Sequence, residues 1–170
     1  RIKKVFSVAL LRKSFPYALL ILLMMLYNRI DAVMLERLLD DGDQQAGVYA
    51  QGFRILDAVN MFALLFAGLL LPIFARLLKN KESINEIKNL AIGILGTLSI
   101  VTALICFMFR QELIHFRYEG ASALAGQTFG FLILSFIPVA MTYIYGTLLT
   151  ANGSLKQLNY MAIFGLVLNV

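Results

Sequence analysis

The chain has 170 residues, of which 60% are hydrophobic and only 15% are charged, and its formal net charge is +5. Soluble domains are about half apolar and about a quarter charged, so this composition excludes an ordinary soluble domain and favours an integral membrane protein. The positive charge does not indicate nucleic acid as a partner, because the basic residues form short clusters between apolar runs rather than one basic patch.

A basic amphipathic segment opens the chain. Residues 1–13, RIKKVFSVALLRK, carry five basic side chains and no acid, with apolar side chains between them. Such a segment is predicted to lie along the membrane surface, as a cytoplasmic entry to the first span.

Five membrane helices are predicted after this segment, the last of them partial. Apolar runs long enough to cross a bilayer predict spans at about residues 14–39, 48–77, 90–109 and 122–151. A further run at residues 158–170 is too short to cross, so we expect the chain to be an internal piece of a longer membrane protein. The predicted fold class is all-α, since the sequence lacks the alternating segments of about 10 residues that build a membrane barrel.

The predicted loops alternate in charge. The loop at residues 76–88 is basic, whereas the loop at residues 40–45, DDGDQQ, carries three aspartates and the loop at residues 110–119 is mixed. Since basic loops stay in the cytoplasm, the N-terminus and residues 76–88 are predicted to be cytoplasmic, with residues 110–119 on the opposite side.

Two features of the fourth predicted span indicate how it packs. Pro138 lies deep in this span, where its missing hydrogen bond predicts a kink. Gly126 and Gly130 form a GxxxG pair that would let another helix approach closely. The alternative, that these are two ordinary glycines of a glycine-rich membrane helix, stays open.

The sequence holds no recognisable catalytic cluster. His115 is the single histidine and is expected in a loop beside Phe116, and no zinc-ligand, nucleophile or phosphate-loop motif occurs. The lone Cys106 excludes an intrachain disulfide. No catalytic residue, metal or cofactor is therefore predicted.

Four charged residues inside the first two predicted spans are the candidate functional residues: Arg29, Asp31, Arg54 and Asp57. A charge in a membrane helix costs roughly 2.5–3.5 kcal/mol on insertion scales, so each is expected to face a partner or a cavity. The two spans form a hairpin that turns near Gly42, which places Asp31 level with Arg54, and Arg29 level with Asp57. On their helix Arg29 and Asp31 point some 160° apart, so only one of them is expected to pair across the hairpin.

We expect Asp31 to pair with Arg54, and Arg29, which then points the other way, to meet an anionic substrate. The alternative, in which all four charges form ion pairs that only fix helix packing, stays open.

Three stretches resemble one superfamily of membrane exporters. LRKSFPYALLILLMMLYNRIDAVMLERL resembles the first helix of a lobe in the multidrug/oligosaccharidyl-lipid/polysaccharide exporter superfamily, and AGVYAQGFRILDAVNMFALLFAGLLLPIFARLL resembles the second helix of that lobe. The stretch from residue 112 to the end is similar to a later part of the same lobe. Within the superfamily, the polysaccharide-biosynthesis branch fits best, because Arg29-Ile30-Asp31 with Met34-Leu35 after it is similar to the start of that branch's second lobe.

The resemblance implies two six-helix lobes, with twelve to fourteen helices in all, around a V-shaped cavity that opens to each side of a bacterial inner membrane in turn. The present chain would supply about five helices of one lobe. It implies a flippase for an oligosaccharide on a polyprenyl pyrophosphate, with Arg29 and Arg54 neutralising the pyrophosphate and with Asp31 and Asp57 as ion-pair or coupling residues. The coupling ion, H⁺ or Na⁺, stays open.

Other functions also stay open. A multidrug efflux antiporter of the same superfamily usually carries cations, which would favour a cavity dominated by acids. A peptidoglycan-precursor flippase is a second relative. A membrane-embedded polysaccharide polymerase or ligase would need catalytic groups in a large outer loop, and a structural scaffold would not need the four charges within the membrane.

Overall fold

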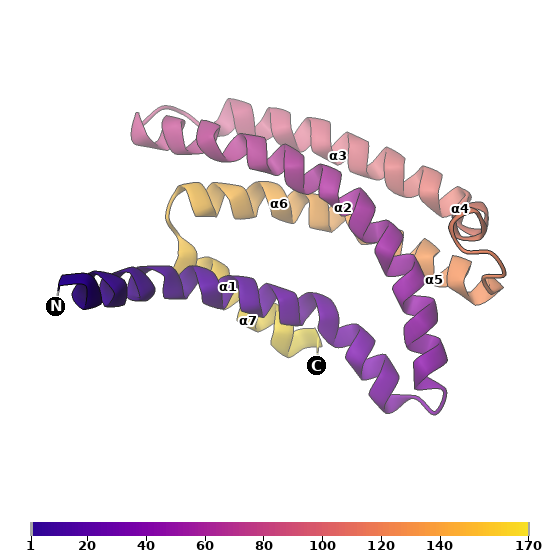
Figure 1. Ribbon diagram of the computed structural model, residues 1–170. Helices are drawn as coiled ribbons and strands as arrows, with labels where there is room; N and C mark the ends of the chain where they lie inside the picture. The colour runs from indigo at the N-terminus through magenta and orange to yellow at the C-terminus, as the bar shows by residue number, and fades with distance from the viewer. Residues whose placement is uncertain (1, 170) are drawn as a thin grey trace.

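The computed structural model describes the backbone of residues 2–169 and the side chains of residues 14–27 and 29–167. This part of the chain is helical throughout, apart from short turns, and confirms the predicted all-α class. The helices are α1 (Ile2–Leu38), α2 (Gly42–Lys79), α3 (Asn85–Met108), α4 (Arg110–Arg117), α5 (Ala123–Leu134), α6 (Phe136–Ala151) and α7 (Leu155–Asn169), as Figure 1 shows.

The helices form two groups that meet at the α1–α2 hairpin. In Figure 1, α2, α3 and α6 run together, whereas α1 and α7 lie side by side below them. The main core is built by α2, α5 and α6, where Phe74, Phe129, Ile133 and Ile144 are fully buried. Small residues allow the close contact, since a Cβ on Gly52 of α2 would lie 3.1 Å from the Cα of Phe129.

Three helices within the described residues are long and apolar enough to cross a membrane: Gly42–Lys79, Asn85–Met108, and Ala123–Ala151, in which α5 and α6 count as one. A fourth is added if Ser14–Tyr27 and Arg29–Leu38, bent by 40°, are one span. The four complete spans expected from the sequence fall on these helices. The partial fifth falls on α7, whose 15 residues are too few to cross a bilayer.

The broken fourth span is explained by its proline. Helix α5 ends at Leu134 and α6 begins at Phe136. In a continuous helix the residue at position 138 would donate to the carbonyl of Leu134, but Pro138 has no N–H to donate. At the break, Oγ of Ser135 donates to the carbonyl of Leu132 at 2.6 Å. The break thus lies within the span in which the sequence predicts a kink.

One segment differs from the sequence-based expectations. Residues 110–117 form helix α4 rather than a loop, so His115 lies on a helix. The basic entry segment continues directly into α1, whose backbone is helical from Ile2. That this entry segment lies along the membrane surface stays a prediction, because its side chains are outside those that the structure describes.

Candidate functional site

An open ion pair joins the two helices of the hairpin. Nη2 of Arg29 on α1 lies 3.9 Å from Oδ2 of Asp57 on α2. The two side chains are 71% and 48% exposed, so the pair is open on one side. The guanidinium carbon of Arg29 also lies 5.5 Å from the centre of the Phe53 ring, within the range of a cation–π contact.

A second polar contact lies closer to the turn. The hydroxyl of Tyr49 on α2 donates to Oδ2 of Asp31 on α1 at 3.1 Å. The Tyr49 ring stacks on that of Phe53, with centroids 5.5 Å apart. Tyr49, Phe53 and Asp57 lie at intervals of four residues, so they form one stripe of α2 that faces α1.

The predicted pairing of charges is corrected by this stripe. The structure shows an ion pair between Arg29 and Asp57 instead of the predicted pair between Asp31 and Arg54. Equal distance from the turn placed Arg29 and Asp57 at one level, but it did not give the direction of each side chain around its helix. Arg54 is one residue beyond Phe53, about 100° around α2, and so lies to one side of the stripe, three residues before Asp57.

Arg54 is exposed and has no ion-pair or hydrogen-bond partner among the side chains that the structure describes. Both aspartates, in contrast, have partners. The formal charges of the two arginines and two aspartates cancel, but Arg54 has no carboxylate partner among the residues described and Arg29 is held by a single carboxylate beyond hydrogen-bonding distance.

Sequence reasoning missed the two aromatic members of the stripe and one buried polar residue. Tyr49 and Phe53 could have been found by tracing the spacing of four residues back from Asp57. Asn159 of α7 is only 9% exposed, and its Nδ2 donates to the carbonyl of Pro16 on α1 at 3.2 Å. This bond joins the two helices of the lower group in Figure 1.

The two glycines of the GxxxG pair lie against the end of α3 and the start of α4. Side chains from these segments fill the space above them: Gln111 over Gly126, and Arg110 with Phe107 over Gly130. Gln111 is fixed there by donating from Nε2 to the carbonyl of Ala123 at 3.0 Å.

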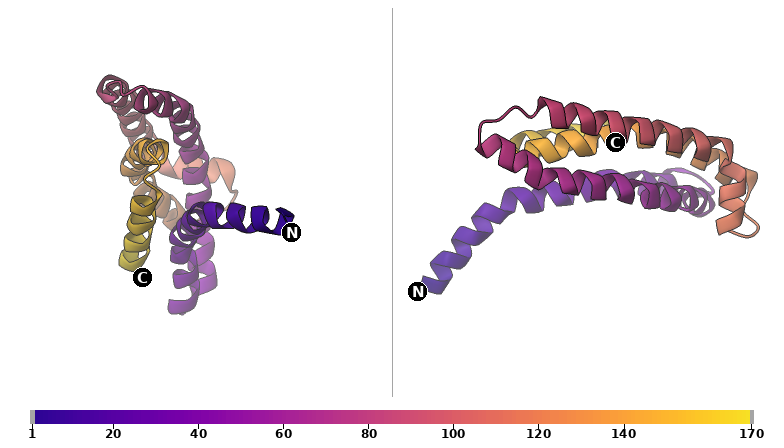
Figure 2. Two further views of the ribbon diagram at one scale, coloured as in Figure 1. Left: turned by 90° about the vertical axis from the view of Figure 1, so that its left-hand side faces the viewer. Right: turned by 90° about the horizontal axis from the view of Figure 1, so that it is seen from above.

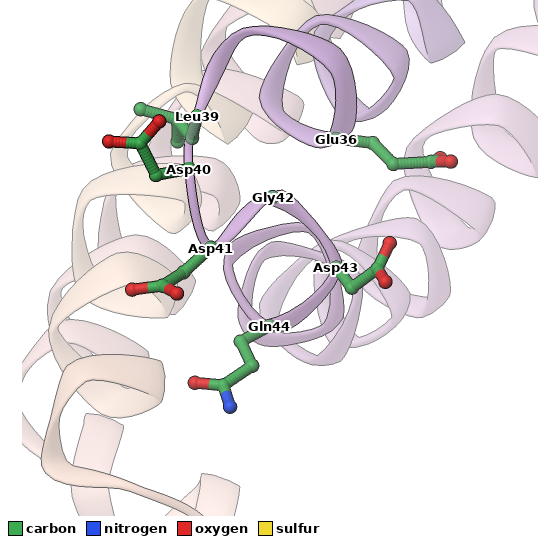
Figure 3. Close-up of a pocket in the computed structure, with 7 residues that line it drawn as sticks. All are labelled: Glu36, Leu39, Asp40, Asp41, Gly42, Asp43 and Gln44. Atoms are coloured by element: carbon green, nitrogen blue, oxygen red, sulfur yellow. The ribbon is translucent and has the colours of Figure 1, made fainter.

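A hollow at the α1–α2 turn is lined by acidic side chains, but their carboxylates do not converge. Figure 3 shows Asp40 and Asp41 on one side of the turn and Glu36 and Asp43 on the other. No group of three or more potential metal ligands occurs among the residues that the structure describes. The geometry at this turn therefore does not indicate a metal site.

Comparison with known proteins gives one match. The family model of MatE matches residues 16–170, which is most of the chain and includes all four intramembrane charges. The search of curated proteins found no match, and neither did the search of solved structures.

Proposed function

This chain belongs to the MatE family of the multidrug/oligosaccharidyl-lipid/polysaccharide exporter superfamily, and we propose that its substrate is an oligosaccharide carried on a polyprenyl pyrophosphate. Family membership implies a multi-pass membrane exporter. The proposal adds the substrate, the direction and the place: a flippase in a bacterial inner membrane, with the N-terminus of this chain cytoplasmic, working by alternating access between two lobes.

The observation that carries the proposal is the uncommitted positive charge of the hairpin. Arg54 has no partner in the described part of the chain, and Arg29 has N–H groups that Asp57 does not occupy at 3.9 Å. A guanidinium is a planar fork of five donors, which suits the oxygens of a pyrophosphate. An arginine within a membrane helix needs water, a partner or an anion, and the substrate would supply the anion.

A multidrug antiporter is the second candidate. Its usual cationic substrates would need an available carboxylate in the cavity. Here Asp31 accepts a hydrogen bond from Tyr49, and a cation at Asp57 would lie beside the positive charge of Arg29. Binding a cation at either would compete with these contacts, which supports the anionic substrate over the cationic one.

The test is Arg54→Ala in the full-length protein, expressed in cells whose surface polysaccharide depends on it. Loss of one charge-assisted contact, about 1.5–3 kcal/mol, should weaken binding by roughly tenfold to a hundredfold. Surface polysaccharide should fall, and the lipid-linked intermediate should accumulate on the cytoplasmic side. Arg54→Lys should keep part of the activity because the charge survives and the fork does not.

The matched control is Arg37→Ala, which removes an exposed arginine at the end of α1 and should leave export unchanged. Normal export by the Arg54→Ala protein would contradict the role of this arginine. If deletion of the gene changed drug susceptibility but not surface polysaccharide, the antiporter would replace the flippase as the proposed function.

A further inference from the structure

Helix α4 crosses the end of α3 instead of continuing it. The backbone leaves the helical conformation at Phe109, with φ −99° and ψ 26°. Figures 1 and 2 show α4 running across the direction of α3 at the far end of the bundle. The spans on either side of it, α3 and α5–α6, are apolar enough to cross a membrane. The connection that holds α4 therefore lies where these spans leave the hydrocarbon core.

One face of α4 is fixed to the protein. Ile114 is fully buried in the core, and Gln111 donates to the carbonyl of Ala123. Arg110 donates from Nη1 to the carbonyl of Phe107 at 3.0 Å, with its guanidinium 4.9 Å from the centre of that residue's ring. These contacts determine which face of α4 points outward.

The outward face carries a large aromatic side chain. Phe116 is two residues beyond Ile114, about 200° around the helix, and so points to the opposite side. It is 90% exposed, the most exposed of the large hydrophobic residues in the described part of the chain. Phe109 nearby is also exposed, and the guanidinium of Arg117 lies 5.1 Å from the centre of the Tyr118 ring.

This composition fits one environment, the boundary between lipid headgroups and acyl chains. Tyr and Trp gather at that depth, and helices that lie there in the plane of the membrane carry Phe, Leu or Trp on their membrane face. Residues 109–122 contain two arginines and two glutamates, so their formal charges cancel with His115 neutral. The segment thus needs no anionic lipid, and its attachment would come from the apolar side chains.

We infer that α4 is a membrane-surface helix whose Phe116 inserts among phospholipid headgroups, fixing the depth at which α3 and α5 leave the membrane. The occupant of this face is the interfacial layer of the bilayer itself, and not another protein or a bound anion. The inference is independent of which substrate the exporter carries.

The test uses tryptophan as a depth reporter, since this chain contains no tryptophan. Phe116→Trp is made in the full-length protein, with any tryptophan outside these residues replaced by phenylalanine. The protein is reconstituted in phosphatidylcholine vesicles brominated either near the headgroup or near the acyl-chain end. Phe62→Trp in the apolar part of α2 and Ser83→Trp in the α2–α3 loop are the matched controls, as both positions are exposed.

Emission from position 116 should be quenched by bromine near the headgroup, with about half of it lost, and much less by bromine near the chain end. Position 62 should show the reverse order, and position 83 should respond to aqueous iodide alone. Iodide quenching at position 116 as strong as at position 83, without quenching by bromine, would place α4 in water and overturn the inference. Protection from both quenchers would mean that a protein covers Phe116, which overturns it as well.

A second probe covers the case in which Phe116→Trp does not fold. Phe116→Cys in a Cys106→Ala background, carrying a nitroxide label, reports depth through its relative accessibility to oxygen and to a water-soluble nickel complex. An interfacial value supports the inference, whereas a fully aqueous value or a value buried in protein contradicts it.

Discussion

Arg29 is held by two neighbours of different kinds, a carboxylate and an aromatic face. A carboxylate oxygen of Asp57 lies 3.9 Å from Nη2 of Arg29 and offsets its charge. The guanidinium carbon lies 5.5 Å from the centre of the Phe53 ring, in a cation–π contact. Neither contact encloses the guanidinium, which remains 71% exposed. Such an arrangement lowers the cost of placing an arginine in a membrane helix and leaves donors available for a ligand.

The Arg29–Asp57 contact should appear as a coupling energy. Arg29→Gln and Asp57→Asn should each lower stability in detergent, and the double variant should lose less than the sum of the two. Polar pairs within a membrane protein average about 0.6 kcal/mol of coupling, which sets the expected size. The cycle is measured by thermal or denaturant unfolding.

A control cycle distinguishes coupling through the ion pair from a general loss of stability in both variants. Arg76→Gln combined with Asp57→Asn should be additive, because Arg76 is exposed and lies 19 residues beyond Asp57 on α2, about 28 Å along the helix. Strict additivity in the Arg29–Asp57 cycle, or equal coupling in both cycles, would mean that the ion pair does not exist in the folded protein.

The sequence predicts the levels of these four charges better than their directions. Arg29 and Asp57 are expected at one level and are found in contact. The choice between the two aspartates and the two arginines needs the rotation of α2 about its axis, and this is determined by the packing of the adjacent face, where Leu56, Ala63 and Phe74 are buried. A charge pattern alone does not contain that information.

At the scale of elements, two glycines of α5 make room for side chains at the turn from α3 into α4. Gly130 leaves room for Arg110, and Gly126 leaves room for Gln111. Both long side chains are held by hydrogen bonds to backbone carbonyls, so neither is free to move aside without losing a bond. The glycines therefore determine how closely α4 approaches α5.

Gly130→Ala should destabilise the protein. The added Cβ would lie 2.5 Å from Cδ of Arg110, in the middle of that side chain and not at its flexible end. Overpacking of this kind costs about 1–3 kcal/mol. A lower Tm in detergent is the expected result, and Arg110→Ala in the same chain should recover part of the loss by removing the overlap.

Gly146→Ala on α6 is the matched control. Nothing lies within 4 Å of its added Cβ, and alanine favours a helix over glycine, so stability should stay the same or rise by about 0.4–1 kcal/mol. Equal effects at positions 130 and 146 would show that the contact with Arg110 does not limit packing.

Sequence patterns differ in how well they predict these elements. Long apolar runs predict α2 and α3, and Pro138 predicts a distortion of the fourth span, because both signals act locally. Helix α4 has eight residues and only one fully buried side chain, Ile114, so it has no apolar run of its own to signal it. Its helical state depends on contacts with α5 that lie outside local sequence.

At the scale of the whole molecule, the polar hairpin of α1 and α2 lies at the junction of two helix groups. Figure 1 shows α1 and α2 diverging from their common turn, with α7 beside α1. The bond from Asn159 to Pro16 ties α7 to α1, whereas α2 packs with α5 and α6. A relative movement of the two groups would therefore change the separation of Arg29 and Asp57.

The orientation of the whole chain is the last property to test, and it rests on the charges of its loops. Residues 76–88 are basic, whereas the α1–α2 turn is acidic, so the first is expected in the cytoplasm and the α4 region on the other side.

Single cysteines at Ser83 and Glu119, both exposed, are introduced in a Cys106→Ala background of the full-length protein, with other cysteines removed. A membrane-impermeant thiol reagent added to intact cells should label position 119 and leave position 83 unlabelled until the membrane is opened. Labelling at position 83 alone would show that the chain has the opposite orientation, with the basic loop on the outer side of the membrane.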